Sequence, residues 1–202
     1  MNATWFYTAG WLGAAALAFG LAFAAPNEAS VMGRLPDFMS RTLGQKNPVT
    51  VPDGLPSDRT LALITFQKEQ RSQAETWITG LNLRNDPSIT WMRMPVINDP
   101  GDIPGRHAVE NKLLNHYPAD AEQANLVPVF IDKARFARSA GLSGPDHVFA
   151  VVLNRNGDVL ARAEGAFDAS KAESLLETLK AGGGADARSA WSIQSLSAPS
   201  VK

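Results

Sequence analysis

The chain has 202 residues, of which 45% are hydrophobic and 19% are charged, a composition typical of a globular protein with a substantial core. Its formal net charge of −1 provides no broad electrostatic attraction for nucleic acid or for an anionic membrane surface. Because the sequence contains no cysteine, it excludes disulfides, thiolate nucleophiles, cysteine-ligated zinc and iron–sulfur clusters.

Residues 1–25 predict a membrane-directed segment. No charged side chain precedes Glu28, and the apolar stretch from Trp5 to Ala25 is long enough to cross a bilayer as a helix. Two interpretations remain open: a signal peptide cleaved before Ala25, or an uncleaved transmembrane anchor. Both predict that the following domain is periplasmic, secreted, or membrane-anchored and facing the periplasm.

Residues 26–58 are dense in Pro and Gly, which interrupt regular structure, so we predict an extended lead-in in which residues 48–56 could hold a short edge strand. Thr60 to Phe66 is a continuous apolar run, the pattern of a strand covered on both faces. A helix should follow, because apolar residues recur there at the spacing of one helical face. They are Ala74, Trp77, Ile78 and Leu81.

The middle of the chain predicts two further strand and helix pairs. Ile89 to Ile97 is a strand candidate, followed by a Pro- and Gly-rich loop at residues 98–105 and a helix from Ala108 to Tyr117. Asn125 to Asp132 is a third strand, which Pro128 favours placing at a sheet edge. Residues 133–142 suggest a short returning helix.

The C-terminal third predicts a hairpin and a helix. Two strand runs meet at Asn156-Gly157, a strong hairpin signal because both residues tolerate positive φ. Ser170, with Glu173 three residues later, matches a capping box at the start of the last helix, which the glycines at 182–184 should end. Residues 183–202 lack periodicity and are predicted to be a flexible tail.

This order of elements predicts an α/β fold with a mixed sheet flanked by helices. It resembles the thioredoxin-like fold, with its parallel first half and its hairpin finish. The sequence VVLNRNGDVLARAEG, from Val151 to Gly165, is similar to the hairpin of peroxiredoxins and thiol-disulfide oxidoreductases. The resemblance covers roughly residues 35–180, and we place the thioredoxin-like domain at residues 59–182, after the N-terminal apolar helix.

The chain departs from the redox members of that family in both halves of their active site. Those members carry cysteines at the turn after the first buried strand and a cis-proline just before the hairpin. Here residues 67–73 provide only amides, charges and Ser72, and the proline's place is held by about Val148, with Pro145 a few residues earlier. Because both halves of the thiol site are missing, we predict that the chain is neither a thiol-disulfide oxidoreductase nor a thiol peroxidase.

Two cysteine-poor groups share these departures. One is a set of exported bacterial proteins of ill-defined role, which have a similar loop at residues 98–105. The other is the mitochondrial ATP-synthase assembly factors, similar in the LPDF sequence from Leu35 to Phe38 and in Trp77. These resemblances imply a non-catalytic accessory or assembly protein that binds another protein, with a membrane complex as the candidate partner, and no cofactor.

The candidate binding site is the corner that replaces the thiol site. Loops on a rigid scaffold are where binding residues concentrate, although a charged turn can also be merely solvated. We expect neither a metal site nor a nucleic-acid partner. The candidate residues are Gln67, Lys68, Glu69, Gln70 and Arg71.

Two alternatives to a protein-binding role remain open. One is a cysteine-independent enzyme, such as a hydrolase, which would use Asp99, Asp102 or His107. The other is a small-ligand-binding protein with a pocket that the sequence does not reveal. Against a metal centre, the three histidines form no HxH or HxxxH pair, and turn-capping is the expected role of the two aspartates. Ser72 is expected to cap a helix.

Overall fold

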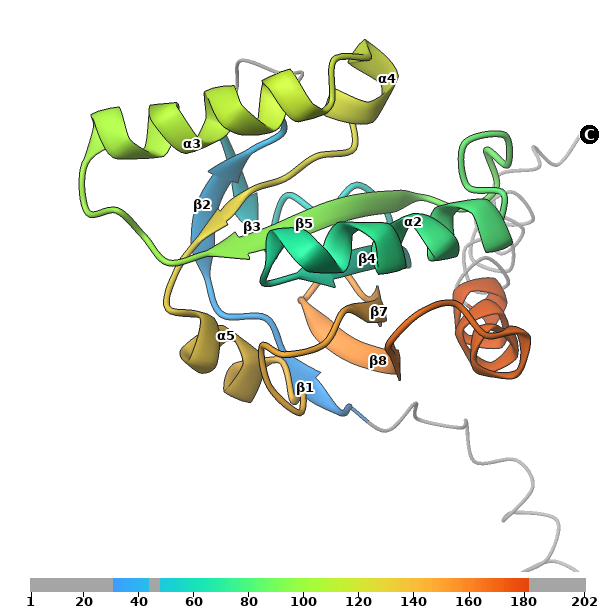
Figure 1. Ribbon diagram of the computed structural model, residues 1–202. Helices are drawn as coiled ribbons and strands as arrows, with labels where there is room; N and C mark the ends of the chain where they lie inside the picture. Colours follow the sequence, from blue (N-terminus) through green and yellow to red (C-terminus); the bar gives the residue numbers. More distant parts are fainter. Residues whose placement is uncertain (1–30, 44–47, 182–202) are drawn as a thin grey trace, which may run out of the picture. The chain divides into compact units, whose positions relative to one another are not determined.

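The computed structural model describes residues 31–43 and 48–181 (Figure 1). The predicted signal peptide or anchor, the predicted tail at residues 183–202 and the glycines at 182–184 lie outside these residues. Among the helices that the described part contains, none is both long and apolar enough to span a membrane.

Six strands form one mixed sheet in the order β1-β8-β7-β4-β5-β6. Strands β4, β5 and β6 are parallel, whereas β7 and β8 form an antiparallel hairpin beside β4. The bounds are β1 Gly33–Arg34, β4 Thr60–Thr65, β5 Trp91–Ile97, β6 Val129–Phe130, β7 Phe149–Leu153 and β8 Asp158–Glu164. The parallel half followed by a hairpin is the arrangement that the sequence predicted, and β6 lies at the edge as expected.

A smaller antiparallel pair, β2 Phe38–Arg41 and β3 Pro48–Val51, stands apart from this sheet. The Ser40 hydroxyl donates a hydrogen bond to the carbonyl of Pro128, and Arg41 forms an ion pair with the buried Glu110. These contacts attach the lead-in to the segment before β6 and to helix α3, which spans Ile103–His116, and β1 extends the main sheet by pairing with β8.

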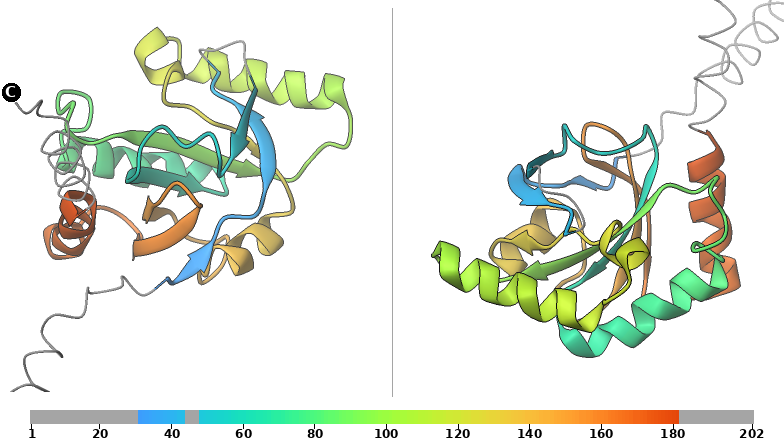
Figure 2. Two further views of the ribbon diagram at one scale, coloured as in Figure 1. Left: turned by 180° about the vertical axis from the view of Figure 1, so that it is seen from behind. Right: turned by 90° about the horizontal axis from the view of Figure 1, so that it is seen from above.

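The helices cover both faces of the sheet (Figure 2). They are η1 Lys68–Gln70, α2 Arg71–Gly80, α3 Ile103–His116, α4 Asp120–Gln123, α5 Lys133–Ser139 and a helix at residues 169–181. On one face, α5 and the β2-β3 pair pack with alternate strand residues such as Ile64 and Val151. On the other, α2 and the last helix contribute Trp77 and Leu175. Strand β4 is buried throughout because both of its faces are covered.

Helix boundaries differ from the sequence expectation at two places. Helix α3 begins inside the predicted loop, at Ile103, because Asp102 caps it by accepting a 2.6 Å hydrogen bond from the Gly105 N–H. Proline at position 104 is compatible with a first helical turn, whose N–H groups have no intrahelical partner. The last helix is capped by Asp168, two residues before the predicted Ser170, and the Asp168 carboxylate accepts from the N–H groups of Ser170 and Lys171.

The hairpin forms as predicted, but its turn differs. Residues 154–157 connect β7 to β8, and only Gly157 has positive φ, at 77°. The side-chain oxygen of Asn154 accepts 2.9 Å hydrogen bonds from the N–H groups of Asn156 and Asp158. Asn154 therefore organises a four-residue turn, and Asn156 does not need the left-handed conformation.

Candidate functional site

The carboxyl ends of β4, β5 and β6 meet at one edge of the sheet, where open α/β folds commonly bind ligands. A cleft of about 400 Å³ opens there, between the corner after β4, the end of β5, helix α3 and the start of α5. Its apolar floor includes Phe66, Pro95 and Leu113. The corner that the sequence singled out therefore forms one wall of a cleft.

Gln70 supports this corner from inside. Its side chain is almost fully buried, with 5% of the residue exposed. The side-chain oxygen accepts hydrogen bonds from the N–H groups of Phe66, at 2.7 Å, and Gln67, at 3.2 Å. The side-chain nitrogen donates to the carbonyl of Pro145, at 3.0 Å. One amide thus joins the strand–helix corner to the loop that precedes the hairpin.

The other four predicted residues have more exposure. Gln67, Lys68 and Glu69 are exposed, and Arg71 is half-buried. Lys68 and Glu69 form a loose ion pair of 3.8 Å with each other, and both side chains are mostly in solvent. All four line the cleft, so the structure brings them together, whereas it places Gln70 beneath them.

Ser72 does not cap α2. It lies in the first turn of the helix, and its hydroxyl donates to the carbonyl of Glu69 at 3.4 Å. The corner is instead organised by Gln70, through the two N–H groups that it accepts from. No general base is paired with the Ser72 hydroxyl in the described part of the chain, so this serine has no nucleophilic arrangement.

Two lysines of the cleft were missed by the sequence analysis. Lys112 lies on α3, next to the buried Leu113, and Lys133 is the first residue of α5. Neither forms an ion pair with a carboxylate of residues 31–43 or 48–181. No local sequence pattern identifies them, because only the packing of α3 and α5 across the strand ends brings the two lysines near the corner.

The cleft therefore concentrates positive charge. Lys68, Arg71, Lys112 and Lys133 line it together with one carboxylate, Glu69. Elsewhere several arginines are neutralised by ion pairs with aspartate or glutamate, namely Arg34, Arg41, Arg106 and Arg155. A cluster of cations in a nearly neutral chain produces a local field that attracts anions.

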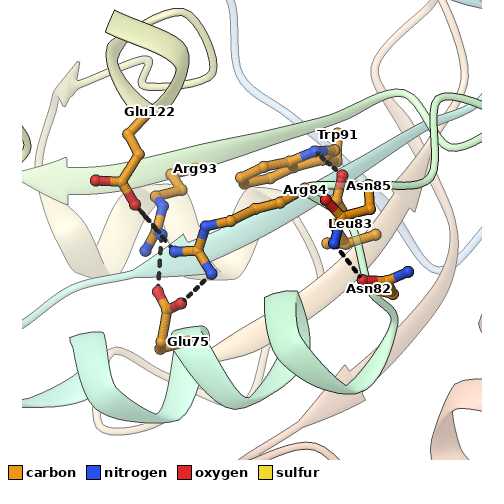
Figure 3. A network of polar contacts seen from close by, with 8 residues as sticks. All are labelled: Glu75, Asn82, Leu83, Arg84, Asn85, Trp91, Arg93 and Glu122. Carbon is orange, nitrogen blue, oxygen red and sulfur yellow. Dashed lines mark hydrogen bonds and ion pairs between the residues drawn. The ribbon is translucent and has the colours of Figure 1, made fainter. Parts of the chain in front are cut away.

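A network of charges fixes α2 beside the cleft (Figure 3). Arg93 on β5 has 5% of its residue exposed and contacts Glu75 on α2, at 2.8 Å, and Glu122 on α4, at 3.5 Å. Arg84 bridges the same two carboxylates at 2.5 and 2.9 Å. The charges of two arginines and two glutamates cancel, so the network adds no net charge beside the cleft. The electrostatic field in the cleft therefore comes from its own cations.

The network also shifts the titration of Glu75. Partial burial acts to raise the pKa of this carboxyl, but hydrogen bonds from Arg84 and Arg93 outweigh burial and hold its pKa below the usual value. The guanidinium carbon of Arg93 lies 4.9 Å from the ring centroid of Tyr117, within cation–π range. Arg93 is thus a structural residue that joins β5 to α2 and α4.

The residues considered for an enzyme have other partners. Asp99 accepts from the N–H of Gly101 and pairs with Arg106, which holds its pKa below the usual value, while Asp102 caps α3. His107 is exposed on α3. In the described ranges, no group of three or more His, Asp or Glu residues is arranged to hold a metal ion.

A second hollow, of about 570 Å³, lies at the other end of β5. Leu55, Asn85 and Trp91 are among its lining residues. None of the predicted site residues contributes to it.

Comparison with known proteins identified no matching family model and no similar curated protein. Among solved structures, a protein of Aquifex aeolicus VF5 proposed to transfer electrons has a TM-score of 0.51 at 11% identity, covering 74% of this chain and 98% of its own. BsSco, of the Sco family of cytochrome c oxidase assembly proteins, has a TM-score of 0.48 at 15% identity, covering 74% and 93%.

The exposed lipoprotein thioredoxin Etrx1 of Streptococcus pneumoniae TIGR4 has a TM-score of 0.45 at 11% identity, covering 72% of this chain and 98% of its own. At sequence identities this low, structural similarity is evidence for the fold alone. The chain has a thioredoxin-like α/β fold, with a mixed sheet flanked by helices and no cysteine.

Proposed function

We propose that the protein is a non-redox, non-catalytic accessory or assembly protein, and that it binds another protein through the corner at residues 67–71 and the adjoining cleft. The observation that carries the proposal is the position of Gln70. Its amide hydrogen-bonds to Phe66, just before the corner where redox members of the fold keep their cysteines, and to Pro145, in the loop before the hairpin. An uncharged amide can support the loops there, but it supplies no nucleophile.

The surroundings of Gln70 support a binding role. Three exposed polar residues and Arg71 lie on a rigid support of buried strand and helix, the arrangement in which loops commonly bind partners. The residues that an enzyme could have used, Asp99 and Asp102, are engaged by Arg106 and by backbone N–H groups. These contacts give both aspartates a structural role.

We further propose that the partner belongs to a membrane complex on the non-cytoplasmic side, because residues 1–25 have the composition of an export signal or anchor. The relation to the mitochondrial ATP-synthase assembly factors stays a hypothesis. Leu35, Phe38 and Trp77, on which it depends, are all buried, and the Trp77 indole N–H donates to the carbonyl of Gly165, so structural roles account for their identity.

One observation favours a second candidate function. The cleft volume of about 400 Å³ falls within the range of small-molecule sites, about 300 to 1,000 Å³. The alternative is therefore a binding protein for a small ligand, held by the same residues.

Site-specific photo-cross-linking in the native host separates these possibilities. A photoreactive amino acid replaces Lys68 at the cleft, or Asn156 in the hairpin turn as a matched exposed control. Because β7 runs antiparallel to β4, residue 156 lies at the opposite end of the sheet. We expect one discrete protein adduct from position 68 that is absent from position 156. No adduct from position 68, or the same adducts from both positions, would contradict the proposal.

A further inference from the structure

We propose that the segment of the partner that enters the cleft is acidic and carries an apolar side chain. This inference rests on the proposed function and specifies the chemistry of the partner. It follows from three features of the cleft: its cations, its floor and the occupied N–H groups of its corner.

Among the described residues, Glu69 is the one carboxylate that lines the cleft beside its cations. Lys112 and Lys133 have no carboxylate partner in the part of the chain that the structure describes, and Lys68 contacts only its neighbour Glu69. Arg71 lies 6.0 Å from the Tyr117 ring centroid and forms no ion pair there either. Four cations facing one carboxylate complement a ligand with several negative charges.

The floor of the cleft complements an apolar side chain. Phe66 and Leu113 are each 3% exposed, and Pro95 is half-buried, so the floor is a packed apolar surface beneath a charged rim. Lysine stems can lie along such a surface while their ammonium groups stay in water. An apolar residue of the partner would rest on the floor, with its neighbouring carboxylates at the ammonium groups.

The state of the corner favours an extended acidic segment over a compact anion such as phosphate. A compact anion at a strand–helix corner is usually held by free backbone N–H groups. Here the N–H groups of Phe66 and Gln67 already donate to the side chain of Gln70. The four cations of the cleft come from three separate parts of the structure, namely the corner, α3 and α5. Cations spaced in this way complement negative charges that are spread along a chain.

The test uses the full chain purified in mild detergent and fluorescently labelled peptides of about twelve residues. One peptide alternates Glu or Asp with Leu or Phe; the other carries Lys and Arg in place of the acids. The cleft variant is Lys112→Gln with Lys133→Gln. The matched control is Arg135→Gln with Arg138→Gln, which removes the same charge from exposed positions of α5 outside the cleft.

We expect the acidic peptide to bind and the basic one not to bind. The cleft variant should weaken binding about 3- to 10-fold, while the control variant changes it less than about 2-fold. Raising the salt concentration from about 0.05 M to about 0.5 M should also weaken binding, because exposed charges are screened.

The inference would be overturned by equal binding of both peptides, by equal effects of the two variants, or by displacement by inorganic phosphate alone. Binding of phosphatidylglycerol vesicles with the same dependence on Lys112 and Lys133 would also overturn it, by assigning the cleft to a lipid surface. The proposed function can survive this failure. If the adduct from position 68 forms but its yield is unchanged in the cleft variant, the protein binds a partner protein, and the inference that the bound segment is acidic is wrong.

Discussion

The amide of Gln70 connects the corner after β4 to the loop that precedes the hairpin. It satisfies the buried N–H of Phe66 and reaches the Pro145 carbonyl across the cleft end of the sheet. Removing it leaves a buried donor without a partner, and such a loss costs about 1–3 kcal/mol. A substitution on the surface costs less, because polar groups that lose a partner there can still hydrogen-bond to water.

We therefore expect Gln70→Ala to lower the free energy of unfolding by about 1–3 kcal/mol, as measured by urea denaturation. Gln73→Ala is the matched control, since Gln73 is exposed on α2 and its side chain forms no hydrogen bond with described residues. It should change stability by less than about 0.5 kcal/mol. Equal effects of the two substitutions would contradict the supporting role of Gln70.

Glu75 gives the structure a dependence on pH. Its pKa is lowered in the folded state, so in acid the unfolded chain binds the proton more readily than the folded chain does. The stabilisation is fully present above the unfolded pKa of about 4.3 and is lost as the pH falls through the lower folded pKa. Because 40% of the side chain is exposed, solvent screening keeps the effect under about 1 kcal/mol.

Urea denaturation between about pH 3 and pH 7 measures this dependence. We expect Glu75→Gln to be less stable than the wild type at pH 7 and to lose less stability on acidification. Ser72→Ala, at an exposed position of the same helix outside the network, should keep the wild-type slope. An unchanged slope in Glu75→Gln would show that the pairing with Arg84 and Arg93 contributes nothing.

At the scale of elements, the turn between β7 and β8 depends on one glycine. Gly157 has a φ of 77°, and a Cβ added there would lie 2.7 Å from Cβ of Pro52. The left-handed conformation alone costs an ordinary residue about 1–2 kcal/mol, and the close contact adds to it. Asn156 is exposed and has no positive φ, so this neighbouring position should be tolerant.

Thermal or urea unfolding of Gly157→Ala and Asn156→Ala tests this difference. We expect the glycine variant to lose about 2 kcal/mol or more and the asparagine variant less than about 0.5 kcal/mol. Comparable losses would mean that both residues need the left-handed conformation, as the sequence alone suggested.

The elements that the sequence predicts well are those whose pattern is local. The run from Thr60 to Phe66 and the face of Ala74, Trp77 and Ile78 identify a buried strand and its helix without tertiary information. The cap of the last helix is harder, because Asp168 and Ser170 are both good capping residues two positions apart. Strand β1 has only two residues and no apolar period, so its pairing with β8 has no local signal.

The same distinction applies to the candidate site. The corner at residues 67–71 can be predicted from the sequence, because it comes directly after a recognisable buried strand. Gln70 is buried against the distant loop at Pro145, and Lys112 and Lys133 reach the cleft because α3 and α5 pack across the strand ends. No short window of sequence encodes either arrangement. The positive character of the cleft therefore emerges only from the folded chain.

At the scale of the whole molecule, the proposed location follows from residues 1–25. Intact mass spectrometry of the protein in soluble and membrane fractions of the host tests it. We expect either a species that begins near Ala25 in the exported fraction, which supports export, or a full-length species in membranes, which supports an anchor. A full-length species confined to the soluble cytoplasmic fraction would contradict the proposed location.

The central claim is that a thioredoxin-like scaffold without sulfur binds a partner at the carboxyl ends of its parallel strands. Amide hydrogen exchange, measured on the chain alone and with the protein cross-linked through residue 68, tests it most directly. The account predicts slower exchange on binding at residues 68–71 and 109–113, with no change at residues 82–90 beside the opposite hollow. Protection confined to residues 82–90, with none at 68–71, would contradict it.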